Sequence, residues 1–230
     1  MHSFMIYFLL FLAYSIIGWV IETIYTAITK REIVNRGFLI GPYCPIYGVG
    51  ALVMIVLLKS YHHDLFALFI VSVFVCTVIE YITSYLMEKI FKARWWDYSD
   101  LPFNINGRVC LLNSVEFGIL SILLIKYVNI FISDFIYNMP DLIRAILFGF
   151  FLGIFTLDII ISVNIINKIK MTVINIKKDH TGEINEKVMR ILIEKSYLFK
   201  RIFAAFPNIR SIIKKAPRFK LLRRNKKNYN

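Results

Sequence analysis

The sequence predicts an all-α protein, a polytopic bundle of about five transmembrane helices followed by a basic amphipathic tail. Its mean hydropathy is +0.63. Charged residues make up 19% of the chain, against roughly 25% in a typical soluble domain. All of the net charge of +13 comes from the residues after 166, because residues 1–166 carry a net charge of −1. We therefore expect a transmembrane helical domain over residues 1–166 and a basic cytoplasmic tail with an amphipathic helix over 167–230.

A helix needs about 20 apolar residues to cross the bilayer core, and several stretches of the chain reach or come near this length. In chain order they are Phe4–Ala27, Pro45–Leu58, Leu65–Met87, Leu111–Ile132 and Leu142–Ile166. The second stretch is short and begins among Gly and Pro residues. It is expected to form a tilted or partly re-entrant helix.

The Lys and Arg residues of the short loops predict the orientation, because cytoplasmic loops carry an excess of both. The loops near residues 30–36 and 89–108 are rich in them, as is the tail, whereas the loops near 59–64 and 134–144 hold few. The first group is therefore predicted to be cytoplasmic. Five spans then place the N-terminus outside and the C-terminus inside, in a multi-pass protein of the cell membrane.

Four acidic residues lie inside the apolar stretches, and they are Glu22, Glu80, Glu116 and Asp158. A carboxylate in the hydrocarbon core costs a few kcal/mol on insertion scales, so it seldom persists without a partner or a task. The predicted topology puts all four in the cytoplasmic half of the bundle, each on a different helix. They are candidates for one polar vestibule that opens to the cytoplasm.

Glu88 follows Glu80 by two helical turns and would lie at the mouth of this vestibule. For Glu88 and Glu116, a simpler interpretation is that the side chain reaches water or pairs with a loop arginine. Glu80 lies deepest in its span, and a functional role is at least as good an interpretation there.

The first cytoplasmic loop reads NRGFLIGPYCPIYGVGA, from Asn35 to Ala51. Gly37, Gly41 and Pro42 interrupt a helix there, while the apolar residues around them resist exposure to water. Irregular backbone at membrane depth is tolerated where it is buried in protein or lines a cavity. Its N–H groups, together with Arg36, are candidates for binding an anion.

The loop before the fourth span reads RWWDYSDLPFNINGRVCLLNS, from Arg94 to Ser114. Its aromatic residues suit the headgroup level, whereas Asp97, Asn104 and Arg108 are polar groups in an otherwise apolar segment. We expect Arg36 and Arg108 either to pair with Glu22 and Glu80 or to hold a phosphate or carboxylate of a ligand. An ordinary interfacial loop with aromatic anchors is an equally good interpretation.

At these two loops the chain resembles a family of small bacterial membrane proteins, the ABC-transporter type IV or CmpB-like permeases. The resemblance covers roughly residues 4–155 and implies a permease. The motif positions that it includes are Glu22, Asn35, Arg36, Gly37, Gly41, Pro42, Glu80, Glu88, Trp96, Asp97, Asn104, Gly107 and Arg108. The sequence contains no GxxxxGK[ST] phosphate-binding loop, so a permease of this kind would need a separate ATPase subunit.

Small residues on two spans, Gly149 with Gly153 and Ser114 with Gly118, predict close helix packing. Packing within the bundle is the simpler interpretation, and homodimerisation is the alternative. In the tail, apolar residues recur at helical spacing among Lys and Arg over residues 183–206. This pattern is typical of a helix on the anionic inner leaflet, and nucleic-acid binding is a weaker alternative.

Three functions fit the sequence. The first is a transport permease in which Glu22 and Glu80 form part of the solute path. The second is a membrane-embedded enzyme acting on a lipid-linked or phosphorylated substrate. Arg36 and Arg108 would hold the phosphate, and Glu80 or Asp97 would act as general acid or base. The third is a membrane scaffold or regulator whose tail recruits partners. The resemblance favours the first, and no cofactor or metal is expected.

Overall fold

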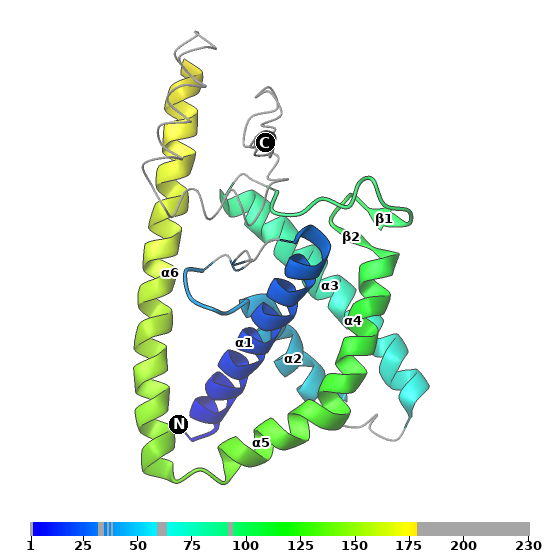
Figure 1. Ribbon diagram of the computed structural model, residues 1–230, viewed down its shortest axis with the longest axis vertical. Helices are drawn as coiled ribbons and strands as arrows, with labels where there is room; N and C mark the ends of the chain where they lie inside the picture. Colours follow the sequence, from blue (N-terminus) through cyan, green and yellow to red (C-terminus); the bar gives the residue numbers. More distant parts are fainter. Residues whose placement is uncertain are drawn as a thin grey trace, which may run out of the picture.

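The structure is a computed structural model that describes residues 2–31, 35, 37, 39–58, 64–91 and 94–178 (Figure 1). Its elements are α1 (His2–Lys30), α2 (Pro45–Leu58), α3 (Leu65–Phe91), β1 (Asn104–Ile105), β2 (Val109–Cys110), α4 (Leu111–Leu123), a π-helical turn (Leu124–Val128), α5 (Asn129–Tyr137) and α6 (Asp141–Lys178). The predicted all-α polytopic bundle is confirmed. Arg36 and the predicted tail helix lie outside the described residues.

Four helical segments of the described chain are long and apolar enough to cross a membrane, and they are His2–Thr29, Leu65–Phe91, Leu111–Tyr137 and Asp141–Lys168. The third of these joins α4, the π-helical turn and α5 without a break. The second predicted stretch forms α2, whose 14 residues extend about 21 Å. That length is less than the roughly 30 Å of a hydrocarbon core, so the expectation of a short second helix is confirmed.

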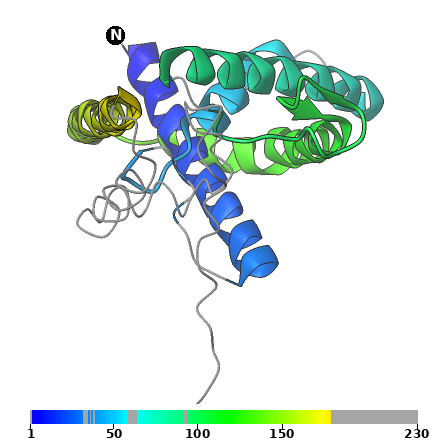
Figure 2. The same cartoon turned by 90° about the horizontal axis from the view of Figure 1, so that it is seen from above.

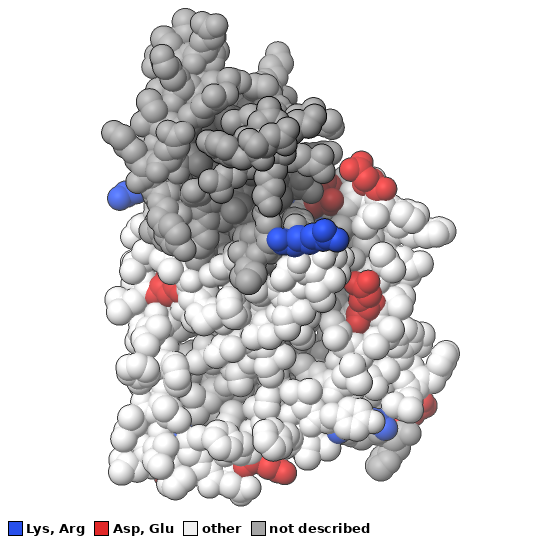
Figure 3. All heavy atoms as spheres, in the orientation of Figure 1, with Lys and Arg blue, Asp and Glu red and all other residues white. Residues whose placement is uncertain are grey.

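Helix α1 lies between α6 on one side and α2, α3 and α4 on the other (Figures 1 and 2). One end of the bundle carries the β1–β2 hairpin and the C-terminal ends of α1 and α6. The opposite end carries the N-terminus and the turn from α5 to α6 (Figure 1). Figure 3 shows a largely uncharged surface between these ends, interrupted by isolated acidic residues. This face is therefore the kind of surface expected of a protein surrounded by lipid.

The chain between α1 and α2 turns back into the bundle before α2 begins. The backbone N–H of Cys44 donates to the carbonyl of Ser15 at 2.8 Å, and Ser15 lies halfway along α1. Pro45 then starts α2, where its missing N–H is harmless because the first helical N–H groups have no partner within a helix. Helix α2 thus begins at mid-depth of α1, in agreement with a partly re-entrant segment.

Glycines allow α1 and α2 to approach each other closely. A Cβ atom at Gly48 would lie 2.3 Å from Ser15 Oγ and 2.4 Å from the carbonyl oxygen of Phe11. A Cβ atom at Gly18 would lie 2.2 Å from the ring of Tyr47. Both positions therefore exclude any side chain larger than hydrogen unless the helices move apart.

The two predicted small-residue pairs have different outcomes. Gly118 on α4 packs against Phe69 and Val73 of α3, so this pair serves packing within the bundle as predicted. Gly149 and Gly153 on α6 have open space where a Cβ would lie. For this second pair the prediction of packing within the bundle is wrong, because α6 turns these residues away from the other described helices.

The turn between α5 and α6 is closed by Arg144, which is 4% exposed. Its guanidinium donates to the carbonyls of Ile136, Tyr137 and Met139 at 2.6–3.2 Å. The first two carbonyls lie at the end of α5, where a helix leaves acceptors without intrahelical partners, and the third lies in the turn that follows. Arg144 therefore fixes the connection at the end of the bundle that carries the N-terminus.

We predict that Gly48→Ala lowers the stability of the bundle by about 1–3 kcal/mol, because the added methyl group overpacks the crossing of α1 and α2. Gly149→Ala is the matched control. It adds the same atom to a helix where space is open, and Ala favours a helix over Gly by roughly 0.5–1 kcal/mol. Thermal unfolding of the detergent-purified variants measures both effects. Equal stability of the two variants would contradict the close crossing.

Candidate functional site

A cavity of about 270 Å³ lies among α1, α2, α3 and the α4–α5 segment. Its walls are mostly apolar. The lining residues are Tyr14, Ile17, Gly18, Ile21, Ile46, Tyr47, Gly50, Ala51, Met54, Cys76, Ile79, Glu80, Phe117, Leu120, Ser121, Leu123, Leu124 and Val128. Glu80 is the charged residue among them, so one carboxyl group faces an otherwise apolar space.

Glu80 on α3 is 5% exposed. Its Oε1 accepts a hydrogen bond from the hydroxyl of Tyr98 at 3.2 Å, and Tyr98 comes from the loop before β1. Its Oε2 is buried and has no hydrogen-bond partner among the described residues. A buried oxygen without a partner is costly, and Glu80 is one of the residues that line the cavity.

Tyr98 ties the loop before β1 to this carboxyl group. Burial, and then the adjacent Glu80 carboxylate, raise the pKa of Tyr98 well above its ordinary value. The phenol therefore stays protonated and acts as the donor at physiological pH. Because the hydroxyl reaches Oε1, the loop covers Glu80 on the side of the bundle where the hairpin lies.

Glu22 on α1 lies near Glu80, close enough for the two carboxylates to interact electrostatically. Its Oε1 accepts a hydrogen bond from the hydroxyl of Tyr47 at 2.7 Å. Tyr47 also lines the cavity, where its ring meets that of Phe117 at a centroid distance of 5.8 Å. The structure thus brings two of the four predicted acids to one region, with tyrosine hydroxyls on both.

Asp158 on α6 has different surroundings. Its carboxylate accepts the N–H groups of Ile40 and Gly41 at 2.9 and 2.7 Å, and also the hydroxyls of Tyr43 and Ser162. The N–H groups of the first loop were predicted to bind an anion. Those of Ile40 and Gly41 bind the side chain of Asp158, which gives the irregular backbone its hydrogen-bond partners.

Asn35 supports the same loop. Its Oδ1 accepts from the indole of Trp19 at 2.7 Å and from the N–H of Gly37 at 3.0 Å, and its Nδ2 donates to the carbonyl of Ile40 at 3.1 Å. A side chain at Gly41 would run into the ring of Tyr43, within 2.4–2.6 Å. Pro42 is exposed and precedes the buried Tyr43. Asn35 and Gly41 are thus explained by the shape of the loop.

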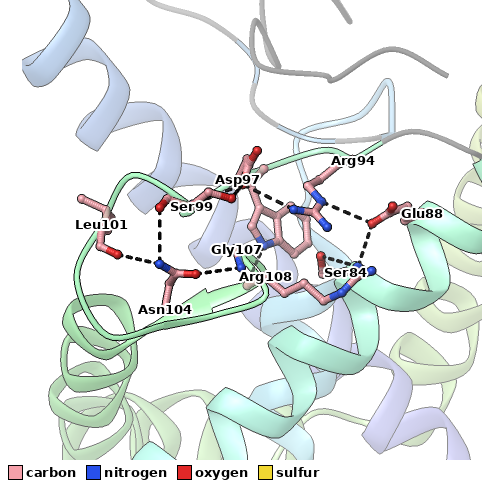
Figure 4. Close-up of polar contacts among 10 residues, drawn as sticks. Ser84, Glu88, Arg94, Asp97, Ser99, Leu101, Asn104, Gly107 and Arg108 are labelled. Atoms are coloured by element: carbon pink, nitrogen blue, oxygen red, sulfur yellow. Dashed lines mark hydrogen bonds and ion pairs between the residues drawn. The ribbon is translucent and has the colours of Figure 1, made fainter. Parts of the chain in front are cut away.

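A network of charged and polar side chains joins the end of α3, the loop before β1 and the turn between β1 and β2 (Figure 4). Glu88 Oε2 lies 2.9 Å from Arg108 Nη1 and 3.3 Å from Arg94 Nε, so one carboxylate bridges two arginines. Arg94 Nη1 also lies 3.4 Å from Asp97 Oδ1. The guanidinium of Arg108 lies over the rings of Tyr81 and Tyr85 at 5.7 and 5.5 Å.

Arg108 was expected to pair with Glu80 or to hold a ligand anion. The expected pairing is wrong. Arg108 pairs with Glu88 and also contacts Ser84. Both residues lie on α3, and Glu88 is one turn nearer its C-terminal end. The simpler interpretation of Glu88, a loop arginine as partner, is confirmed. Glu116 is exposed on α4 and does not line the cavity.

Turn chemistry sets the shape of the hairpin. Asn106 and Gly107 have φ values of 54° and 65°, as the two central residues of a type I′ turn require. Asn104 accepts the N–H of Gly107 at 2.9 Å and donates to the carbonyl of Leu101 at 2.7 Å (Figure 4). Trp96 donates to the carbonyl of Arg108 at 2.9 Å. Asn104 and Trp96 therefore hold the loop together.

The sequence reasoning missed the tyrosines. Tyr43, Tyr47 and Tyr98 each donate a hydroxyl to one of the predicted acids. A signal existed, since all three lie in the two loops that were singled out. Charge alone favours arginine as the partner of a carboxylate, whereas a phenol supplies a donor without burying a second charge.

We predict that Asp158→Asn destabilises the loop before α2 by about 1–3 kcal/mol. The amide would turn a donor toward backbone N–H groups that now donate to a carboxylate. Faster hydrogen exchange over residues 39–44 measures the loss. Ser162→Ala removes one donor and leaves the backbone contacts, so it should change exchange much less. Unchanged exchange in Asp158→Asn would mean that the loop does not depend on this carboxylate.

A comparison with models of protein families matches residues 9–163 to the family described as "Putative ABC-transporter type IV". Comparisons with curated proteins and with solved structures return no match. The matched region contains the cavity, the re-entrant loop and the hairpin, and the apolar helices identify a transport-related membrane protein. Because the match covers more than half of the chain, this protein belongs to the ABC-transporter type IV family.

Proposed function

We propose that this protein is the permease subunit of an ABC-type transporter in the cell membrane, and that its solute path includes the cavity beside Glu80. The family supports a role in transport. The observation that carries the proposal is Glu80 itself, a carboxyl group that lines a cavity inside a membrane bundle and keeps one buried oxygen without a described partner. An ionisable group within a membrane segment marks a substrate or ion path far more often than a lipid contact.

The geometry supports a permease better than a membrane-embedded enzyme. The enzyme hypothesis places arginines on a phosphate group beside a general acid or base. Of the two arginines in this hypothesis, Arg36 lies outside the described residues and Arg108 pairs with Glu88. Asp97 lies in the loop before β1, where it accepts hydrogen bonds from Ser99, and it does not line the cavity. A cavity with one carboxyl group is better suited to binding and release than to acid–base chemistry on a phosphate.

The proposed transporter needs a source of energy from outside this chain, because the sequence contains no phosphate-binding loop. We infer a separate ATPase subunit on the cytoplasmic side. The proposed orientation places the hairpin and the C-terminal end of α6 in the cytoplasm and the turn between α5 and α6 outside. Within this orientation Glu80 lies nearer the cytoplasmic end of α3, and the predicted polar vestibule would open on that side.

Cysteine labelling tests the orientation. In a variant without the native cysteines, Asp100→Cys in the hairpin segment should react with a membrane-impermeant maleimide in inverted vesicles and resist it in intact cells. Asn138→Cys, at the turn after α5, should show the reverse. Both positions are exposed, so accessibility depends on the side of the membrane. Labelling of both from the same side would overturn the proposed topology.

Affinity purification tests the partner. The tagged full chain, extracted in mild detergent, should carry an ATPase subunit in constant stoichiometry, detected by mass spectrometry. Glu80→Gln should retain this subunit, because Glu80 lies inside the bundle and away from a cytoplasmic interface. A chain that purifies alone with a bound lipid or phosphorylated metabolite would contradict the permease and favour the enzyme.

A further inference from the structure

We propose that the cavity beside Glu80 binds a small organic amine in its protonated form, with the ammonium group donating to Glu80 Oε2 and the apolar part filling the cavity. This inference names the substrate class of the proposed solute site, and its significance for transport rests on the proposed function. Binding of the amine needs this chain alone and does not require the proposed ATPase subunit.

The charge of the cavity selects a cation. Glu80 is the charged residue that lines it, and Glu22 adds a second carboxylate nearby. No Lys or Arg belongs to the described lining. The nearby Arg94 and Arg108 are paired with acidic residues, Glu88 and Asp97. An anion would meet repulsion in a space of low dielectric, where charges act strongly. An ammonium group would offset the cost of the buried carboxylate.

The hydrogen bonding of Glu80 selects a donor. Tyr98 donates to Oε1, and the buried Oε2 has no partner among the described residues. A protonated amine can supply an N–H to this oxygen, and a charge-assisted bond of this kind is about twice as strong as a neutral one. A quaternary ammonium carries the charge without the N–H, so it would leave Oε2 without its bond.

The remaining walls select an apolar body. Ile17, Ile79, Met54 and Leu120 are among the lining residues, and the rings of Tyr47 and Phe117 meet at one wall. Aromatic faces attract a cation as well as an apolar group. A volume of about 270 Å³ exceeds the 150 Å³ of an engineered apolar cavity that binds benzene. The space therefore accommodates a ring together with a short amine.

The described residues do not suit a metal ion. Calcium takes six to eight oxygen ligands and magnesium demands octahedral geometry. No group of three or more His, Cys, Asp or Glu side chains in the described part of the chain could hold a metal. The lining offers one carboxyl group among aliphatic and aromatic side chains. An organic cation needs one hydrogen bond and apolar contact, and both are present.

Binding of 2-phenylethylamine tests the inference. The full chain is placed without an ATPase in nanodiscs of phosphatidylcholine, and equilibrium binding of the tritiated amine is measured above that of empty nanodiscs. We expect saturable binding to the wild type and at least tenfold weaker binding to Glu80→Gln. We also expect at least tenfold weaker competition by 2-phenylethanol and phenylacetate, which match the amine in shape and differ in charge.

Two variants keep the test decisive. Glu116→Gln makes the same change on an exposed face of α4 and should bind as the wild type does. Gly50→Leu should abolish binding while Glu80 stays intact, because Gly50 lines the cavity and has no atom within 4 Å of a Cβ at that position. Thermal unfolding without ligand checks that each variant is folded. If Glu80→Gln does not fold, Gly50→Leu provides the test of the site.

Equal binding of the amine by wild type and Glu80→Gln would overturn the inference, as would equal competition by 2-phenylethanol or undiminished binding by Gly50→Leu. The proposed function fails separately. Amine binding that depends on Glu80, in a chain that copurifies with no ATPase, would uphold the binding site and overturn the permease.

Discussion

The hydrogen bonds of Asp158 are the interaction on which the rest of this bundle depends. The chain after α1 turns into the membrane region as irregular backbone, where N–H groups have no water to bind. One carboxylate of α6 takes the N–H groups of Ile40 and Gly41 and the hydroxyl of Tyr43. This contact fixes where α2 starts, and the position of α2 in turn creates a wall of the cavity beside Glu80.

Asp158 and Glu80 are both buried acids in membrane helices, yet they are satisfied to different degrees. The carboxylate of Asp158 accepts four donors from the chain. Glu80 accepts one from Tyr98, its second oxygen is buried without a described partner, and the residue lines a cavity. Asp158 is therefore explained by the architecture. Glu80 retains a binding capacity that the described chain does not use, which is why the two acids receive different roles.

The sequence located the residues of the site better than it located their partners. It singled out Glu22, Glu80 and Asp158 because an acid is conspicuous in an apolar stretch. It paired Arg108 with Glu80 by charge alone, whereas the hairpin places Arg108 beside Glu88. The pairing depends on the type I′ turn at Asn106 and Gly107, which sets the direction of the chain before α4. Of the four acids, Glu80 is the one that lines the cavity. The common vestibule for all four acids therefore stays a prediction.

The sequence by itself determined the class of this protein, the positions of its apolar helices and the short second helix, because length and hydropathy act locally along the chain. It also determined the family, since the resemblance at the two loops agrees with the family match over residues 9–163. Only the tertiary structure decided which donors meet each acid, that Gly48 rather than Gly149 lies in a close helix crossing, and that a cavity forms beside Glu80. These features arise where residues distant in sequence come together, and packing between helices is not encoded in the pattern of any single segment.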